Sequence, residues 1–409
     1  MISQLAAGLS PLEDLTIPVE GSMSAARLLS AALRRLLRDL GGILHPASGV
    51  GDPQLRADLR ALAHAAKERT PGALASALRS ADVGLWIRCL RPGASAGIDR
   101  EVGLVRFAWS FARALSRVEG WPLGCRLRVA GPLLPGRLAS LAAREVVEVS
   151  AASSTGAIEF SAEGLRVSGE GVAEPPAVVV AGRYVEITGA PSMVLATVDD
   201  NPLAEVEAHP EKAGNAIDLG GHSVAEWCTS LADALALIGE HLPDLRREIG
   251  LYIQQFVPVG AYAERHLSAS YQEAIGTVYL SLHAQRMTMV EAVIHEFSHN
   301  KLNALFEVDA VLQNAFSSVH SSPLRPDPRP LHGVLLAVHA FLPVARLYER
   351  MITAGDPRLG AGGAERLQQI IDINHRAAMV IQEHARPTAL GAGLVAEIDR
   401  WDRYFAALT

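Results

Sequence analysis

A chain of 409 residues with 49% hydrophobic and 20% charged residues can form a packed soluble protein of two or three domains or of one elaborated domain. Its 44 acidic residues outnumber its 37 basic residues, and the net charge of −7 argues against a nucleic-acid-binding protein. The 3 cysteines are widely spaced without a C-x-x-C pair, which excludes a structural zinc ribbon and indicates reduced thiols in a cytoplasmic protein.

The region 1–120 is expected to be helical. Ala, Leu and Arg dominate residues 24–80, with breaks near residues 45–53 and at Pro71, and residues 81–116 continue the helical pattern. The first residues lack the basic and apolar segments of a signal peptide, and no stretch approaches about 18 uncharged apolar residues. We therefore expect no membrane partner.

The region 121–200 is expected to form a β-rich unit. Short β-branched runs, such as residues 146–149, 157–160 and 177–180, alternate there with Gly-rich turns. This spacing is typical of a small antiparallel unit, and none of its residues have metal-ligand spacing. We expect it to act as a scaffold or as a peptide-docking surface.

The region 201–409 returns to a helical pattern and is expected to be catalytic. Helices are predicted at residues 223–241, 331–351, 365–385 and 394–408, the second kinked at Pro343, and extended segments at residues 249–259 and 274–282. A further helix should start at a capping box, Thr288 to Glu291. The expected fold class is therefore α+β, mainly helical, with a small β unit in the middle and a strand followed by a helix in the last region.

That strand-then-helix pair carries the pattern H-E-x-x-H, formed by His295, Glu296 and His299. Two imidazoles four residues apart lie about 40° from each other around a helix, so both can reach one metal ion. Glu296 is turned about 100° from His295, so it is placed to serve water or substrate beside the metal. The pattern predicts a metal centre with His295 and His299 as ligands.

The third ligand is less directly indicated. Leu302 and Leu305 stand where the extended metzincin pattern requires Gly and His, so that class is excluded. Glu307 and Asp309 are the nearest downstream carboxylates, but they would lie about 12 to 15 Å along the helix from His299. They cannot bind the same metal ion unless the helix breaks.

Two histidines of the next predicted helix, His332 and His339, share one face. We favour His339 as the third ligand, because it lies within an apolar stretch where an unpaired imidazole is costly. The alternative is that His339 is a core histidine bonded to a backbone carbonyl.

Residues 295–305, the Asp-Pro-Arg-Pro loop at residues 327–330 and the helix through His339 resemble the H-E-x-x-H domain proteins found beside ribosomally made peptide natural products. The resemblance covers residues 268–351, and members of that group look like 2-oxoglutarate-dependent peptide β-hydroxylases. It implies that His295, His299 and a third residue hold Fe(II), that 2-oxoglutarate chelates the metal, and that the partner is a precursor peptide.

A dicarboxylate co-substrate needs a cation at its far end, and Lys301 or Arg329 can supply one. The alternative is that both are members of structural ion pairs. Iron oxygenases usually use two histidines and one carboxylate, whereas this set has three histidines. Glu296 could be a ligand only if the helix geometry were unusual, so we assign it to supporting the metal ligands or to proton handling.

Three functions are compatible with these residues. The first is an Fe(II)- and 2-oxoglutarate-dependent hydroxylase acting on the β-carbon of a residue in a precursor peptide. The second is a zinc metallopeptidase in which Glu296 is the general base. The third is a metal-stabilised peptide-binding protein without catalysis.

Overall fold

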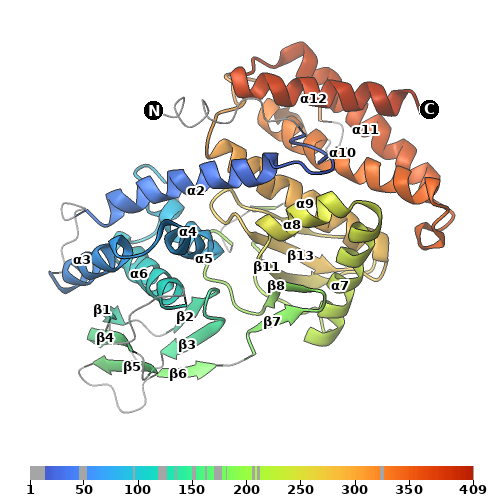
Figure 1. Ribbon diagram of the computed structural model, residues 1–409. Coiled ribbons are helices and arrows are strands. Elements are labelled where there is room, and N and C mark those ends of the chain that lie inside the picture. The colour runs from blue at the N-terminus through green and yellow to red at the C-terminus, as the bar shows by residue number, and fades with distance from the viewer. Residues whose placement is uncertain are drawn as a thin grey trace.

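A computed structural model describes residues 14–45, 53–94, 97–117, 127–133, 136–149, 153–161, 164–169, 177–180, 182–204, 208–209, 212–322 and 327–408 (Figure 1). These residues form a mainly helical α+β fold, which confirms the fold class expected from the sequence.

The first part of the chain is helical, as its composition predicts. Its helices are α2 (Ser24–Ile43), α3 (Pro53–Lys67), α4 (Pro71–Arg79), α5 (Ala81–Cys89) and α6 (Arg100–Ser116). Pro71 stands at the first position of α4, and the Thr70 side chain caps that helix by accepting a hydrogen bond from Ala73 N. The expected break at Pro71 is thus the start of a helix.

Two antiparallel three-stranded sheets follow. One has the order β1 (Leu127–Leu133), β4 (Ser153–Ser161), β5 (Gly164–Gly169), and the other has the order β2 (Gly136–Ser140), β3 (Glu145–Val149), β6 (Ala177–Val180). Neighbouring strands pair in antiparallel register, such as Val147 with Val179. These sheets are the small β unit expected in the middle of the chain.

A five-stranded sheet lies beside the helix that carries the H-E-x-x-H pattern. Its order is β12 (Ser268–Ala269), β13 (Thr277–Leu282), β11 (Gln255–Ala261), β8 (Ala190–Ala196), β7 (Tyr184–Ile187). The central strand β11 is parallel to β13 and β8, and the edge strands β12 and β7 are antiparallel to their neighbours.

The region boundary at residue 200 therefore falls differently from the expectation. Strands β7 and β8, which we grouped with the β unit, pair into the sheet of the last region. The physical reason is burial, because Met193, Val194, Leu195 and Ala196 are all almost inaccessible and need neighbours on both faces.

The described residues of the last part of the chain include six helices: α7 (Val224–His241), α8 (Pro243–Tyr252), α9 (Arg286–Phe306), α10 (Leu331–Thr353), α11 (Gly363–His384) and α12 (Ala389–Ala406). The remaining short elements are β9 (Ala208–His209), β10 (Lys212–Ala213), β14 (Val319–His320), β15 (Arg329–Pro330) and the 3-10 turn η1 (Pro357–Leu359). Figure 1 shows α10, α11 and α12 stacked on the side of α9 that faces away from β11 and β8. Helix α9 contacts β12 and β13 on one side and α10 on the other.

The start of α9 differs from the expected capping box. The helix begins at Arg286 after Gln285, which makes no side-chain cap. The Glu291 carboxylate instead accepts hydrogen bonds from the Tyr348 hydroxyl at 2.5 Å and from Arg366 Nη2 at 2.7 Å. Tertiary partners on α10 and α11 thus replaced the local capping interaction.

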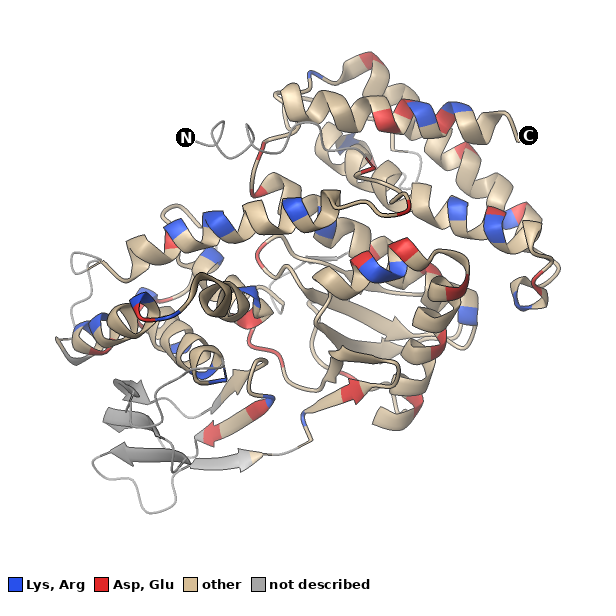
Figure 2. Cartoon of the chain, in the orientation of Figure 1, with Lys and Arg blue, Asp and Glu red and all other residues tan. Residues whose placement is uncertain are grey.

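Helix α2 connects two hydrophobic cores. Leu28 and Ala31 pack into the large core of the sheet and the C-terminal helices, whereas Leu36 and Leu40 pack into the core of the N-terminal helices. Figure 1 shows α2 running from above α3 to the region above α9. Acidic and basic residues are interspersed along the chain, for example in α11 and α12 (Figure 2).

Among the described helices, α10 has the length and apolar composition of a membrane span, but most of it is buried inside the protein. Its apolar residues, including Leu335, Leu342 and Leu347, belong to the large core. We therefore interpret α10 as a core helix.

A buried ion pair fixes the side of α9 that faces α8. Lys301 Nζ lies 2.6 Å from Glu248 Oε2 on α8 and 3.3 Å from the Asp14 carbonyl oxygen, and the Lys301 and Glu248 side chains are 1% and 2% exposed. A charge at this depth is tolerated only when it is paired, because burial removes its hydration. The pair therefore ties α9, α8 and the start of the described chain together.

Lys301→Met should lower the free energy of unfolding by about 3–5 kcal/mol, because it leaves the Glu248 carboxylate buried without a partner. Urea unfolding measures this change. Lys301→Met combined with Glu248→Leu should recover most of the loss, since no uncompensated charge then remains.

The matched control is Arg247→Met, which breaks the exposed 2.8 Å pair between Arg247 and Asp244 and should cost less than about 1 kcal/mol. An equal cost for the Lys301 and Arg247 variants would show that the buried pair does not hold α9 in place.

Candidate metal centre

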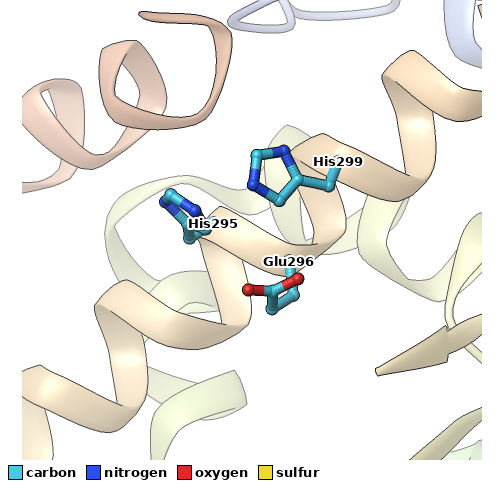
Figure 3. A group of neighbouring side chains, drawn as sticks. All are labelled: His295, Glu296 and His299. Atoms are coloured by element: carbon cyan, nitrogen blue, oxygen red, sulfur yellow. The ribbon is translucent and has the colours of Figure 1, made fainter. Parts of the chain in front are cut away.

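The two imidazoles of the H-E-x-x-H pattern lie together on α9. Their ring centroids are 4.4 Å apart, with an angle of 81° between the ring planes. One ligand atom each from His295, Glu296 and His299 lies within 4.8 Å of the other two, and Figure 3 shows the two imidazoles side by side on one side of the helix. The structure thus brings these three residues together as their spacing predicts.

Asn300 orients this part of α9 against the sheet. Its Oδ1 accepts a 2.7 Å hydrogen bond from Gly276 N, and its Nδ2 donates to Ser270 Oγ at 3.0 Å. Gly276 has φ of +104°, a conformation that a side chain would strain, and it lies just before β13. The side chain after the second histidine therefore anchors the motif to the residues that follow β12 and precede β13.

Burial keeps both imidazoles neutral. It lowers the pKa of His295 and holds the pKa of His299 well below its usual range, the latter with a contribution from neighbouring histidines. A neutral imidazole with a free lone pair is the form that binds a metal ion.

The donor set fits a metal ion. His299 Nδ1 and Glu296 Oε2 are buried and have no hydrogen-bond partner within the described structure. Unpaired buried polar atoms are costly, and a cation held between the imidazoles would lie beside both groups. Glu296 is only 2% exposed, so its carboxylate is shielded from bulk water at the place where a proton acceptor is useful.

A pocket of about 580 Å³ opens at His295. Titratable side chains and the phenyl ring of Phe341 line it: His266, Glu291, His295, Phe341, Tyr348 and Arg366. The Phe341 ring lies 5.0 Å from the His295 ring and covers one side of it. The pocket is therefore a space where a small molecule can reach His295.

The structure does not bring His339 into the group of His295, Glu296 and His299. His339 Nε2 lies 3.0 Å from the Leu15 carbonyl oxygen, and the residue is 1% exposed in the core. This is the alternative of a core histidine bonded to a carbonyl. His332 is also apart, between the rings of Phe306 and Phe316 at 4.7 and 4.9 Å.

The two cations proposed for the co-substrate also lie elsewhere. Lys301 is engaged with Glu248 on the opposite side of α9, and Arg329 Nε lies 2.8 Å from Asp327 Oδ2. Neither residue lines the pocket at His295. Both are thus found in ion pairs, as the structural alternative expects.

The nearest downstream carboxylate has a structural role. Glu307 is 1% exposed and accepts hydrogen bonds from Arg91 Nη1 at 2.8 Å and Nη2 at 2.5 Å. It therefore links the end of α9 to the N-terminal helices.

Sequence reasoning missed His266, Tyr348 and Arg366, which come from a loop and from two later helices. No spacing pattern connects them to the motif. Glu291 could have been found, because it precedes His295 by one helical turn and lies on the same face.

A second group of ligand-type side chains consists of Glu240, His241 and Asp356. Arg358 binds both carboxylates of this group, and Asp356 also lies 2.7 Å from His241 Nε2. A guanidinium already neutralises the cluster, so we interpret it as an ion-pair network.

No family model matches the chain, and no curated protein matches it.

The metal-free protein should lose stability as pH falls below about 6.5. Burial lowers the pKa of His266 to about 4 and the pKa of His339 to about 3. The unfolded chain therefore binds protons from pH 6.5 downwards while the folded chain does not, so the free energy of unfolding decreases with falling pH.

Each such histidine contributes up to about 1.4 kcal/mol per pH unit in this window, which urea unfolding at pH 7.5, 6.5 and 5.5 measures. His339→Gln should make the dependence shallower, and His64→Gln, on the exposed face of α3, should leave it unchanged. An unchanged slope in His339→Gln would contradict the assignment of a neutral core imidazole.

Proposed function

We propose that this protein is an Fe(II)- and 2-oxoglutarate-dependent hydroxylase that acts on the β-carbon of a residue in a ribosomally made precursor peptide, in the cytoplasm. The observation that carries the proposal is the presence of His295 and the Arg366 guanidinium in one pocket. A 2-oxo dicarboxylate that chelates a metal through one end needs a cation for its other carboxylate, whereas activation of water on zinc needs none.

Arg366 thus takes the part that we first assigned to Lys301 or Arg329. Its Nε and Nη2 donate to Glu291 at 3.1 and 2.7 Å, and its Nη1 makes only a long 3.4 Å hydrogen bond to Gln369. Glu291 holds the guanidinium in position, and Nη1 is the donor available to a bound carboxylate.

Each residue of the site would have a separate role. His295 and His299 would hold the iron as neutral nitrogen ligands, and bound iron with 2-oxoglutarate and oxygen supplies the oxidising chemistry. Phe341 packs against the His295 ring in an edge-to-face contact and would limit the access of water from that side. Glu296, buried beside both imidazoles, would hold or transfer a proton at its Oε2 atom.

The position of β12 supports a peptide as the substrate. β12 is the last strand of the five-stranded sheet, and its residue Ser268 lines the same pocket as His295. An extended peptide bound along this edge would present alternate side chains to the pocket.

A zinc metallopeptidase is the second candidate, and the buried, unpaired Glu296 Oε2 favours it. In that case Glu296 would remove a proton from a metal-bound water molecule. The two functions share His295, His299 and Glu296 and differ in their need for Arg366.

Purified protein with Fe(II) and ascorbate should convert 2-oxoglutarate to succinate, and a precursor peptide encoded beside the gene should gain one oxygen atom. Succinate is measured by chromatography and the peptide by mass spectrometry. His295→Ala should abolish both signals, because the metal loses a ligand. Peptide fragments that form with zinc alone, without 2-oxoglutarate, would favour the peptidase and contradict the hydroxylase.

Arg366→Gln should raise the KM for 2-oxoglutarate about 10- to 100-fold, corresponding to loss of one charge-assisted contact of about 1.5–3 kcal/mol. The matched control is Arg376→Gln, an exposed residue of the same helix, which should leave the KM unchanged. Equal KM values for the two variants would remove Arg366 from the co-substrate site.

A further inference from the structure

His266 lies in the loop between β11 and β12 and lines the same pocket as His295. Its Nε2 atom is buried and has no hydrogen-bond partner among the residues that the structure describes. A hydrogen bond with the backbone of Ser281 raises the pKa of His266 against the lowering by burial, and because Nε2 has no partner we assign this bond to Nδ1.

This arrangement has a physical meaning. An imidazole whose Nδ1–H donates to a backbone carbonyl has its lone pair on Nε2, and that is the usual tautomer and orientation of a metal ligand. Left without a partner in a buried place, the same lone pair is a cost to the fold. The structure therefore places an unsatisfied nitrogen lone pair in the pocket that His295 lines.

The backbone next to His266 is well anchored. Leu267 N donates to Ser281 Oγ at 2.9 Å, and the Leu267 carbonyl accepts a 2.7 Å hydrogen bond from Ser281 N. Ser281 belongs to β13, the strand that leads into α9. The residue thus stands on a strand-supported position, which holds a ligand more accurately than a free loop does.

His339 is the main rival for the same role, since its Nδ1 is also buried without a partner. His339, however, lies within the core of α10, bonded to Leu15, with the Lys301 cation acting on it. A nearby cation disfavours a second positive charge, and the packed helix gives the ring no room to turn. Glu291 is the other rival, and its carboxylate is already bound by Tyr348 and Arg366.

We propose that His266 is the third protein ligand of the metal, binding through Nε2 together with His295 and His299. This inference rests on the metal centre of the proposed function. His266 lies outside the group of ligand atoms within 4.8 Å of one another, whereas nitrogen ligands on one ion are about 3.3 Å apart. Metal binding would therefore draw His266 Nε2 toward the pair.

The consequence for chemistry is a neutral three-histidine set. Such a set would leave the full charge of the metal to act on a bound co-substrate or water molecule. It also leaves Glu296 free for proton transfer and Arg366 free for a carboxylate, so no residue has two roles.

Metal binding to the full chain, stripped with a chelator, tests the inference without measuring turnover. Co(II) is titrated at pH 7.5, its visible absorption reports the ligand number, and isothermal titration calorimetry reports the affinity. The parent protein should bind one ion, and His295→Ala should abolish stoichiometric binding. His266→Ala should bind about 100-fold more weakly or worse, with altered Co(II) absorption.

Three variants act as controls. His339→Ala and Glu291→Gln test the rival ligands, and His283→Ala tests a histidine whose ring lies 6.5 Å from that of His266 but which lines the neighbouring pocket. All three should bind Co(II) with the parent affinity. Added imidazole should restore the parent Co(II) absorption to His266→Ala, which a variant damaged in its fold would not show.

The role of His266 and the existence of the metal centre are tested by different results. Parent affinity in His266→Ala together with weakened binding in His339→Ala would overturn the role of His266 and leave the metal centre intact. Absence of Co(II) binding by the parent protein would overturn the metal centre, and the role of His266 with it.

Discussion

The buried ion pair between Lys301 and Glu248 is the constraint on which the orientation of α9 depends. Lys301 follows His299 by two residues, so it points about 200° away from that imidazole around the helix. Fixing Lys301 against α8 therefore turns the histidine face toward the pocket. The same ammonium group also binds the Asp14 carbonyl, and the next residues, Leu15 and Thr16, donate from their backbone to the buried Glu397 carboxylate at 2.6 and 3.0 Å. A short segment near the chain start thereby connects α9 with α12.

The face of α9 that carries His295 and His299 has to bind a cation, so its side chains meet a different requirement. Burial makes the charged form of each imidazole unfavourable, so His295 and His299 remain neutral and able to bind a cation. The Oε2 atom of Glu296 is buried beside them without a hydrogen-bond partner among the described residues, a cost that a bound cation would offset. The hydroxylase and the peptidase would both use this arrangement, and they differ in what occupies the rest of the pocket. That difference lies in Arg366 on α11, far from the motif in sequence.

Much of this protein could be predicted from local pattern. The helical start of the chain, the strand followed by the H-E-x-x-H helix, and the meeting of His295, Glu296 and His299 all depend on residues close in sequence, and each is found in the structure. Helix periodicity alone places side chains four residues apart on one face, so no tertiary information is needed.

Other features depend on partners that are distant in sequence, and these only the tertiary structure decided. The apolar stretch around His339 indicated burial correctly, but the Leu15 carbonyl, not the motif, is its hydrogen-bond partner. Lys301 had the charge expected of a co-substrate ligand, yet Glu248 lies within 2.6 Å on the opposite side of the helix. His266 and Arg366 carry no spacing signal, because a loop and a separate helix bring them to the pocket. Sequence determined which residues share a helix face, and the packing of helices against the sheet decided what that face meets, since only three-dimensional contact sets burial and charge pairing.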